Sequence, residues 1–324
     1  MPSFSCADES RQAKESPIGS AAHHAAYVVL ECPPPWPSDD LSAPPIPEAL
    51  RQLSHSLTPS GQRIRWLLVH APHDPPSESV RLWVFQQPSG LAGGYHQQAF
   101  QVSSLEAAAP VIQAALRGQP VTDWQVANTY RELLICTHGS HDRCCGRYGL
   151  PFYRQALTLL SEAQQQNLRI WQASHFSGHR FAPTVLTFPD GRYYGRLDLA
   201  ALRGLINRRG NLQTLMPCYR GWGILPDPVQ VFERDLWLRH GWAWLEHRIQ
   251  YKILAQAPTH TEIELVAQSP TGGFTRYGGV VAADCQPLLL LHGECSSRPD
   301  EVYEFPQFEL IDPISIVLTT GPAC

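Results

Sequence analysis

The sequence predicts an α/β protein in which two stretches repeat one order of strands and helices, followed by a smaller α+β region. Three observations lead to this prediction. Short apolar segments of strand length alternate with segments of helical periodicity, and turns containing proline or glycine separate them. The chain of 324 residues is also long for one hydrophobic core.

The first stretch begins with the apolar strand 26–31, which a proline-rich loop follows. The later segments are predicted in the order helix, strand, strand, strand, helix, over residues 46–57, 64–70, 81–86, 98–103 and 105–117.

The second stretch repeats this order from the strand 132–137, which carries Cys136 near its end. A helix, three strands and a second helix are predicted over residues 150–166, 168–174, 184–188, 192–197 and 199–207. The strand–helix–strand crossover makes a parallel pair, and the turn Pro189-Asp190-Gly191 predicts an antiparallel hairpin.

This order is the one that a four-stranded thioredoxin-like unit requires. We therefore predict tandem thioredoxin-like domains over residues 1–125 and 126–210. The first is interpreted as a degenerate half, because the spacing of its few cysteine and histidine residues does not match the second half. Residues 211–324 are predicted to form a small α+β appendage that begins with the long helix Val229–Ala255.

Composition and charge exclude several classes of partner. A net charge of −4 gives no basic face for nucleic acid, and no apolar run approaches the roughly 18 residues that span a bilayer. The N-terminal segment lacks the apolar stretch of a secretory signal, so a cytoplasmic protein is expected. In a reducing compartment its nine cysteines are better read as ligands, catalytic thiols or buried residues than as disulfides.

Two pairs of residues suggest a metal centre. Cys136 and Cys145 are separated by eight residues, and His175 and His179 by three. Cys136 and His175 follow the two strands of the predicted parallel pair. Parallel neighbours end at the same edge of a sheet, so both ligand loops should meet there.

Two thiolates and two imidazoles suit either tetrahedral zinc or a 2Fe–2S cluster. The eight-residue gap is wide for a zinc finger, where the two cysteines are usually two to four residues apart. A wide loop is expected when the ligands enclose two irons, which favours the cluster.

Two segments of the chain resemble the sucrase/ferredoxin-like family, which is related to thioredoxin-like ferredoxins. They are ICTHGSHDRCCGRYGLPFY and SHFSGHRFAPTVLTFPDGRYYGRLD. The resemblance is dense over residues 130–200, and PIGSA with VVLECPPPW is similar to the family's N-terminal signature. The fungal members that it resembles are bis-histidinyl 2Fe–2S proteins with the same C-x8-C and H-x3-H arrangement. The resemblance implies four cluster ligands, at Cys136, Cys145, His175 and His179. The sucrase part of the name finds no support, because no carboxylate pair of the glycosidase kind is evident.

Cys144 stands beside Cys145 and is a substitute candidate for the second cysteine ligand, although the family spacing favours Cys145. Nearby side chains have two readings each. His138 and His141 either tune the cluster or stabilise the loop, and the nearby arginines either attract an acidic redox partner or are ordinary surface residues. Cysteines further along the chain lack metal-ligand spacing and are read as buried or incidental thiols: Cys218, Cys285, Cys295 and Cys324.

The expected function is one-electron transfer to an unidentified redox partner protein, by a carrier rather than a self-contained enzyme. Neither G-x-G-x-x-G nor a P-loop occurs. A zinc-braced interaction module is the alternative. A thiol oxidoreductase ranks lower, because the chain contains no C-x-x-C.

Overall fold

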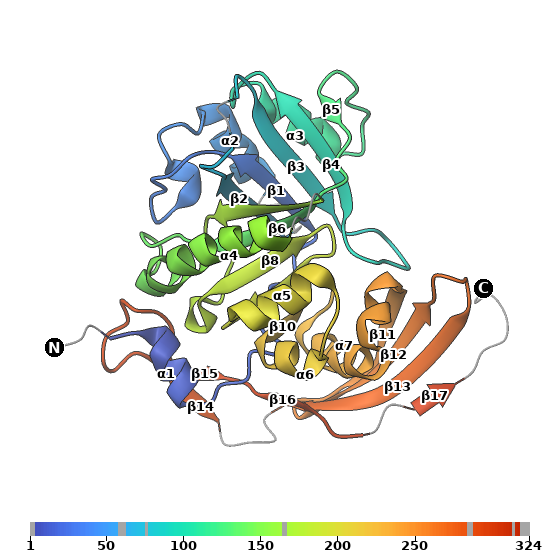
Figure 1. Ribbon diagram of the computed structural model, residues 1–324. Coiled ribbons are helices and arrows are strands. Elements are labelled where there is room, and N and C mark those ends of the chain that lie inside the picture. Colours follow the sequence, from blue (N-terminus) through green and yellow to red (C-terminus); the bar gives the residue numbers. More distant parts are fainter. Residues whose placement is uncertain are drawn as a thin grey trace.

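A ten-stranded mixed sheet runs through the upper and middle parts of the protein (Figure 1). Its strand order is β10-β9-β8-β6-β7-β2-β1-β3-β4-β5. The computed structural model describes residues 4–57, 63–74, 77–163, 167–283, 288–312 and 315–317. The predicted positions Gln166, Cys285 and Cys324 lie outside these residues.

The sheet contains the two repeated element orders that the sequence predicts. The first comprises β1 Ala26–Glu31, α2 Glu48–Leu57, β2 Ile64–His70, β3 Val80–Gln86, β4 His96–Val102 and α3 Ala108–Leu116. The second comprises β6 Arg131–Cys136, α4 Leu150–Ala163, β7 Leu168–Ala173, β8 Thr184–Phe188, β9 Arg192–Gly195 and α5 Leu199–Asn207. The short strand β5, Gln125–Val126, lies between them and pairs with β4.

Strand pairing confirms both predicted parallel pairs, β1 with β2 and β6 with β7. The hairpin of β8 and β9 around Asp190-Gly191 is antiparallel, as predicted. The two halves meet where β2 pairs antiparallel with β7 through Val69 and His70. They therefore form one continuous sheet.

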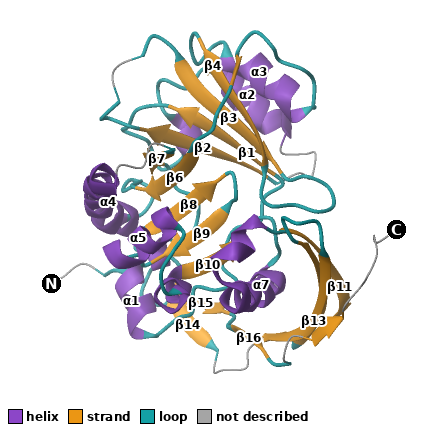
Figure 2. Cartoon of the chain, turned by 45° about the vertical axis from the view of Figure 1, so that its right-hand side comes forward, coloured by secondary structure: helices purple, strands orange, loops and turns teal. Residues whose placement is uncertain are grey.

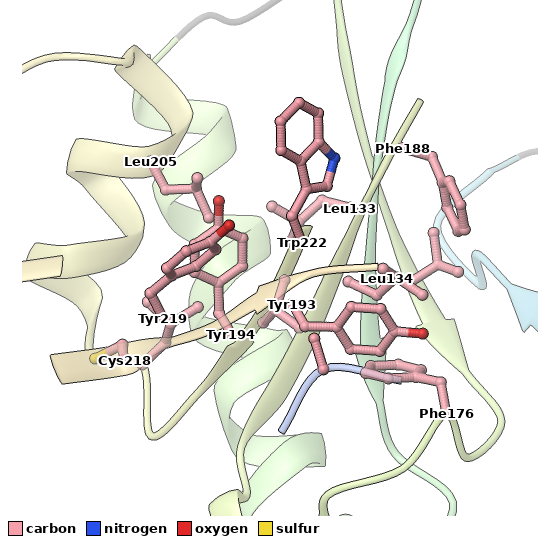
Figure 3. Close-up of a cluster of buried hydrophobic side chains, with 14 of the residues drawn as sticks. Leu133, Leu134, Phe176, Phe188, Tyr193, Tyr194, Leu205, Cys218, Tyr219 and Trp222 are labelled. Atoms are coloured by element: carbon pink, nitrogen blue, oxygen red, sulfur yellow. The ribbon is translucent and has the colours of Figure 1, made fainter. Parts of the chain in front are cut away.

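Side chains that alternate along the strands enter two different cores. In β1, Val28 and Leu30 lie in a core with buried residues of α2 and α3. Tyr27 and Val29 lie in a larger core that includes residues of α4, α5 and α7. Figure 3 shows part of this larger core, where side chains of β6, β9 and β10 lie together. The larger core thus joins both halves to the C-terminal region.

The C-terminal region contributes to the large sheet and also forms a second one. Its elements are α6 Leu212–Leu215, β10 Tyr219–Trp222, α7 Asp227–His240, β11 Arg248–Gln256, β12 His260–Gln268, β13 Phe274–Ala283, β14 Leu289–His292, β15 Val302–Phe305, β16 Phe308–Leu310 and β17 Ser315–Val317. Strand β10 pairs with β9, whereas β11, β12, β13, β16 and β17 form the second, curved sheet (Figure 2). No helix among the described residues combines the length and the apolar character needed to cross a membrane.

The predicted helix Val229–Ala255 is wrong in its second half. Helix α7 ends at His240, and Gly241 follows with φ 68°, a left-handed conformation that ends helices readily. After a 3₁₀ segment, residues 248–256 form β11 and pair with β12. Pairing with a neighbouring strand overrides the helical appearance of this segment.

A buried ion pair ties α7 to the large sheet. Arg192 of β9 and Glu233 of α7 are almost fully buried, with Arg192 Nη1 donating to Glu233 Oε1 at 3.0 Å. Tyr219 and Trp244 also donate to the Glu233 carboxylate, at 2.8 and 2.6 Å.

Replacing Glu233 with alanine should lower the free energy of unfolding by about 3–5 kcal/mol, because it leaves Arg192 charged and unpaired in the core. Denaturant unfolding measures this change. Glu48→Ala, at an exposed pair with Arg51, is the control and should lower the free energy of unfolding much less, because water screens an exposed ion pair. Equal losses for the two variants would contradict this account of the ion pair.

Candidate metal centre

The cysteine loop, residues 137–144, connects the end of β6 to the helical turn before α4. Cys136 is the last residue of β6, and Cys145 begins a π-helical turn, Cys145–Gly149, that leads into α4. A Cβ atom on Gly149 would collide with the carbonyl oxygen of Cys136. Only glycine permits this close approach, which brings the start of α4 against the end of β6.

The histidine loop follows β7, whose last residue, Ala173, pairs with Cys136. Ser177 and Gly178 have φ values of 83° and 78°, so the chain turns sharply between His175 and His179. A Cβ atom on Gly178 would collide with the guanidinium of Arg220. The chain therefore makes a tight turn at Gly178.

Three of the four predicted ligands meet at this edge of the sheet. His175 Nδ1 lies 3.6 Å from Cys145 Sγ and 4.0 Å from Cys136 Sγ. The three ligand atoms all lie within 4.8 Å of one another. Both cysteines are 1% exposed and His175 is 8% exposed, so the group is shielded from water.

His179 lies beside this group, but its Nδ1 faces other residues. Its ring centroid is 5.4 Å from that of His175. Its Nδ1 lies 3.3 Å from Cys6 Sγ and 3.5 Å from Asp142 Oδ2. His179 is half-buried, whereas Cys136, Cys145 and His175 are buried, which makes it the most accessible of the four predicted ligands.

The adjacent cysteines Cys144 and Cys145 point toward different groups. Cys144 Sγ lies 3.6 Å from Cys6 Sγ and 3.2 Å from Cys295 Sγ. Together with Asp142 these three residues form a second group that could hold a metal ion. Sequence reasoning missed it, because no local spacing connects Cys6 or Cys295 to the cysteine loop.

Hydrogen bonds and burial determine the protonation of Cys136, Cys145 and His175. Burial opposes ionisation of Cys136, but hydrogen bonds from the Cys145 thiol, the backbone of His138 and Thr184 together outweigh burial and lower the pKa of Cys136. The hydrogen bond between the two thiols, with burial, raises the pKa of Cys145. Burial, with neighbouring basic side chains, lowers the pKa of His175. A thiolate and a neutral imidazole are the forms that bind metals.

His138 braces the two loops through backbone contacts. Its Nδ1 accepts the backbone N–H of His175 at 3.1 Å, and its Nε2 donates to the carbonyl of Pro37 at 2.7 Å. The His141 ring stacks on that of His175, with centroids 3.9 Å apart. The loop-stabilising role therefore has direct contacts in its favour for His138.

The arginines near the loops are mostly engaged within the protein. Arg143 donates to the carbonyls of Phe4 and Cys295, and Arg180 pairs with Glu15 at 2.7 Å. Arg147 is more exposed, at 57% of its side chain.

The chain belongs to the sucrase/ferredoxin-like family, whose sequence model matches residues 17–221. It is 32% identical over 79 residues to "Altered inheritance of mitochondria protein 32" of Meyerozyma guilliermondii. That match covers 23% of this chain and 28% of the relative, so the chain spans less than a third of the relative's length. No solved structure matches the chain.

Proposed function

We propose that this protein carries single electrons on a 2Fe–2S cluster with Cys136, Cys145, His175 and His179 as its ligands. The observation that supports this most directly is the convergence of Cys136, Cys145 and His175 at one sheet edge, with His179 beside them. We also infer that each half of the sheet is a thioredoxin-like unit. The matching strand orders β2-β1-β3-β4 and β7-β6-β8-β9 support this inference.

The residues present fit such a cluster in number and chemistry. Two sulfur and two nitrogen ligands on adjacent loops give the mixed ligation known from bis-histidinyl 2Fe–2S centres. When bound, the cluster supplies reversible one-electron transfer. Two imidazoles in place of two thiolates remove negative charge, which raises the reduction potential above that of a plant-type ferredoxin.

The protein's own residues shield the site unevenly. Both cysteines and His175 are buried, whereas His179 reaches solvent. An electron partner therefore approaches from the side of His179. We propose an unidentified redox protein as that partner, with neither nucleic acid nor membrane involved.

A cytoplasmic location is also proposed. All cysteines among the described residues are free thiols, which suits a reducing compartment. The relative in Meyerozyma guilliermondii is named for the inheritance of mitochondria, which makes a mitochondrial location the alternative.

The burial of the cysteines argues against direct thiol chemistry. Reactive cysteines need partial access to solvent, and Cys136, Cys144 and Cys145 are each 1% exposed. A thiol oxidoreductase is therefore the weakest of the three readings.

Anaerobic purification, iron and zinc analysis and EPR spectroscopy after dithionite reduction test the proposal. We expect about two irons per chain, a brown protein and a reduced-state signal with a low average g value. His175→Ala should remove most of the iron. Colourless protein with no signal after anaerobic reconstitution, holding a zinc ion that His175→Ala removes, would instead establish the zinc-braced module.

A further inference from the structure

Three cysteines from distant parts of the chain meet outside the proposed iron site. Cys6 begins α1, Cys6–Gln12; Cys144 lies in the cysteine loop; and Cys295 follows β14. Their Sγ atoms are 3.2 to 3.6 Å apart in all three pairs. Figure 1 shows α1 beside β14 and β15, below the large sheet.

We propose that Cys6, Cys144, Cys295 and Asp142 form a second metal site, which binds one zinc ion. All four ligand atoms lie within 4.8 Å of one another, and all four residues are buried. A tetrahedral ion with Zn–S bonds of about 2.3 Å places its sulfur ligands roughly 3.7 Å apart. The three observed separations are close to that value. A multi-iron cluster spreads its ligands over several metals, so such mutual contact favours a single ion.

The acidic residue of the site is held in place by backbone donors. Asp142 Oδ1 accepts the N–H of Cys144 at 2.7 Å, and Oδ2 accepts the N–H of Cys295 at 2.9 Å. Arg143 donates to the carbonyl of Cys295 at 2.9 Å, and its positive charge offsets part of the negative charge of three thiolates and a carboxylate. The carboxylate therefore fixes the backbone of two cysteine ligands while it faces the sulfur atoms.

Among the described residues, the two buried cysteines that belong to neither group, Cys32 and Cys218, lack this arrangement. Cys32 Sγ and Cys218 Sγ contact backbone carbonyls, at 3.8 and 3.5 Å. A disulfide does not explain the group either, because its S–S bond is about 2.05 Å long and it would leave one of three thiols unpaired. Binding of a thiophilic metal ion, in contrast to a disulfide, would use the sulfur atoms of all three cysteines.

The site would fasten both terminal regions to the large sheet. Helix α1 has only seven residues, too few to be stable alone in water. Cys6 and Cys295 lie outside the residues 17–221 that match the family, whereas Asp142 and Cys144 lie within them. The zinc site uses cysteines other than those of the proposed iron site, but the two sites are neighbours, because His179 Nδ1 lies 3.3 Å from Cys6 Sγ and 3.5 Å from Asp142 Oδ2.

Metal analysis of the full chain after anaerobic purification with zinc supplied tests the proposal. About one zinc ion per chain is expected, with X-ray absorption showing Zn–S distances of about 2.3 Å. Cys6→Ser and Cys295→Ser should each abolish stoichiometric zinc while iron is retained. Asp142→Asn should weaken zinc binding by at least roughly 10- to 100-fold. His179→Ala should keep the zinc and lose the iron.

Cys218→Ser is the matched control, a buried cysteine outside both groups, and should retain both metals. Because a serine variant can fail to fold, alkylation of the wild-type protein is a second test. A zinc chelator should make Cys6, Cys144 and Cys295 reactive to the alkylating reagent together.

Zinc-free wild-type protein after reconstitution, stoichiometric zinc in both serine variants, or a Cys144–Cys295 disulfide would each overturn the proposal. Loss of zinc in His179→Ala with zinc kept in Asp142→Asn would overturn the assignment of Asp142.

Discussion

Replacing Cys145 with serine should remove the iron from this protein, whereas replacing Cys144 should leave the iron and remove zinc. Cys145 Sγ faces His175 Nδ1 at 3.6 Å. Cys144 Sγ faces Cys295 Sγ at 3.2 Å. Each substitution removes a ligand from one group and leaves the thiols of the other group intact.

Iron and zinc contents, with the visible spectrum, measure the two effects in one preparation of each variant. We expect less than about a tenth of the wild-type iron in Cys145→Ser, because a buried cluster that loses one thiolate ligand is not retained. Cys218→Ser is again the control. Iron loss in Cys144→Ser with iron kept in Cys145→Ser would mean that the two cysteines have the opposite roles.

Local geometry explains why the sequence alone could not assign these adjacent cysteines. Cys144 has helical φ and ψ values of −65° and −35° and directly precedes the π-helical turn. Successive side chains in helical conformation diverge by roughly 100°, so neighbours face different surroundings. Spacing along the chain gives the reach of a ligand, but not the direction of its side chain.

Strand topology, in contrast, could be predicted because it follows from local patterns. The crossover from β6 to β7 fixes a parallel pair, and this pair places Cys136 and the histidine loop at one edge. The elements of both halves agree with the predicted ranges to within a few residues. Short-range patterns were sufficient here, because each ligand loop directly follows a strand.

Contacts between segments that lie far apart in the sequence were the part that local patterns could not give. Cys6 and Cys295 are brought together by the packing of α1 against β14, to which no spacing rule applies. The error in the helix Val229–Ala255 has the same origin. The apolar pattern suited a helix, whereas β12 and the left-handed Gly241 decide the structure.

His179→Cys should lower the midpoint potential by on the order of a few hundred millivolts and remove its dependence on pH. A thiolate in place of a neutral imidazole adds negative charge, which stabilises the oxidised state. In the wild type the potential should fall as pH rises, because protonation of an outer imidazole nitrogen favours the reduced state. The slope should approach about 59 mV per pH unit for one proton and one electron.

We expect His179, rather than His175, to accept this proton. The Nε2 atom of His175 accepts the backbone N–H of Ser177 at 3.1 Å, so it is already occupied, and His175 is 8% exposed. His179 is half-buried, and its Nδ1 lies 3.5 Å from Asp142 Oδ2, which can stabilise an added proton. Protein-film voltammetry over a range of pH measures the slope, with His141→Ala as the control because its ring stacks on His175 but is not a predicted ligand. A flat wild-type potential, or a slope that persists in His179→Cys, would show that His179 does not carry the proton. Retention of the slope in His141→Ala together with its loss in His179→Cys would instead place the proton on the ligand nearest to solvent.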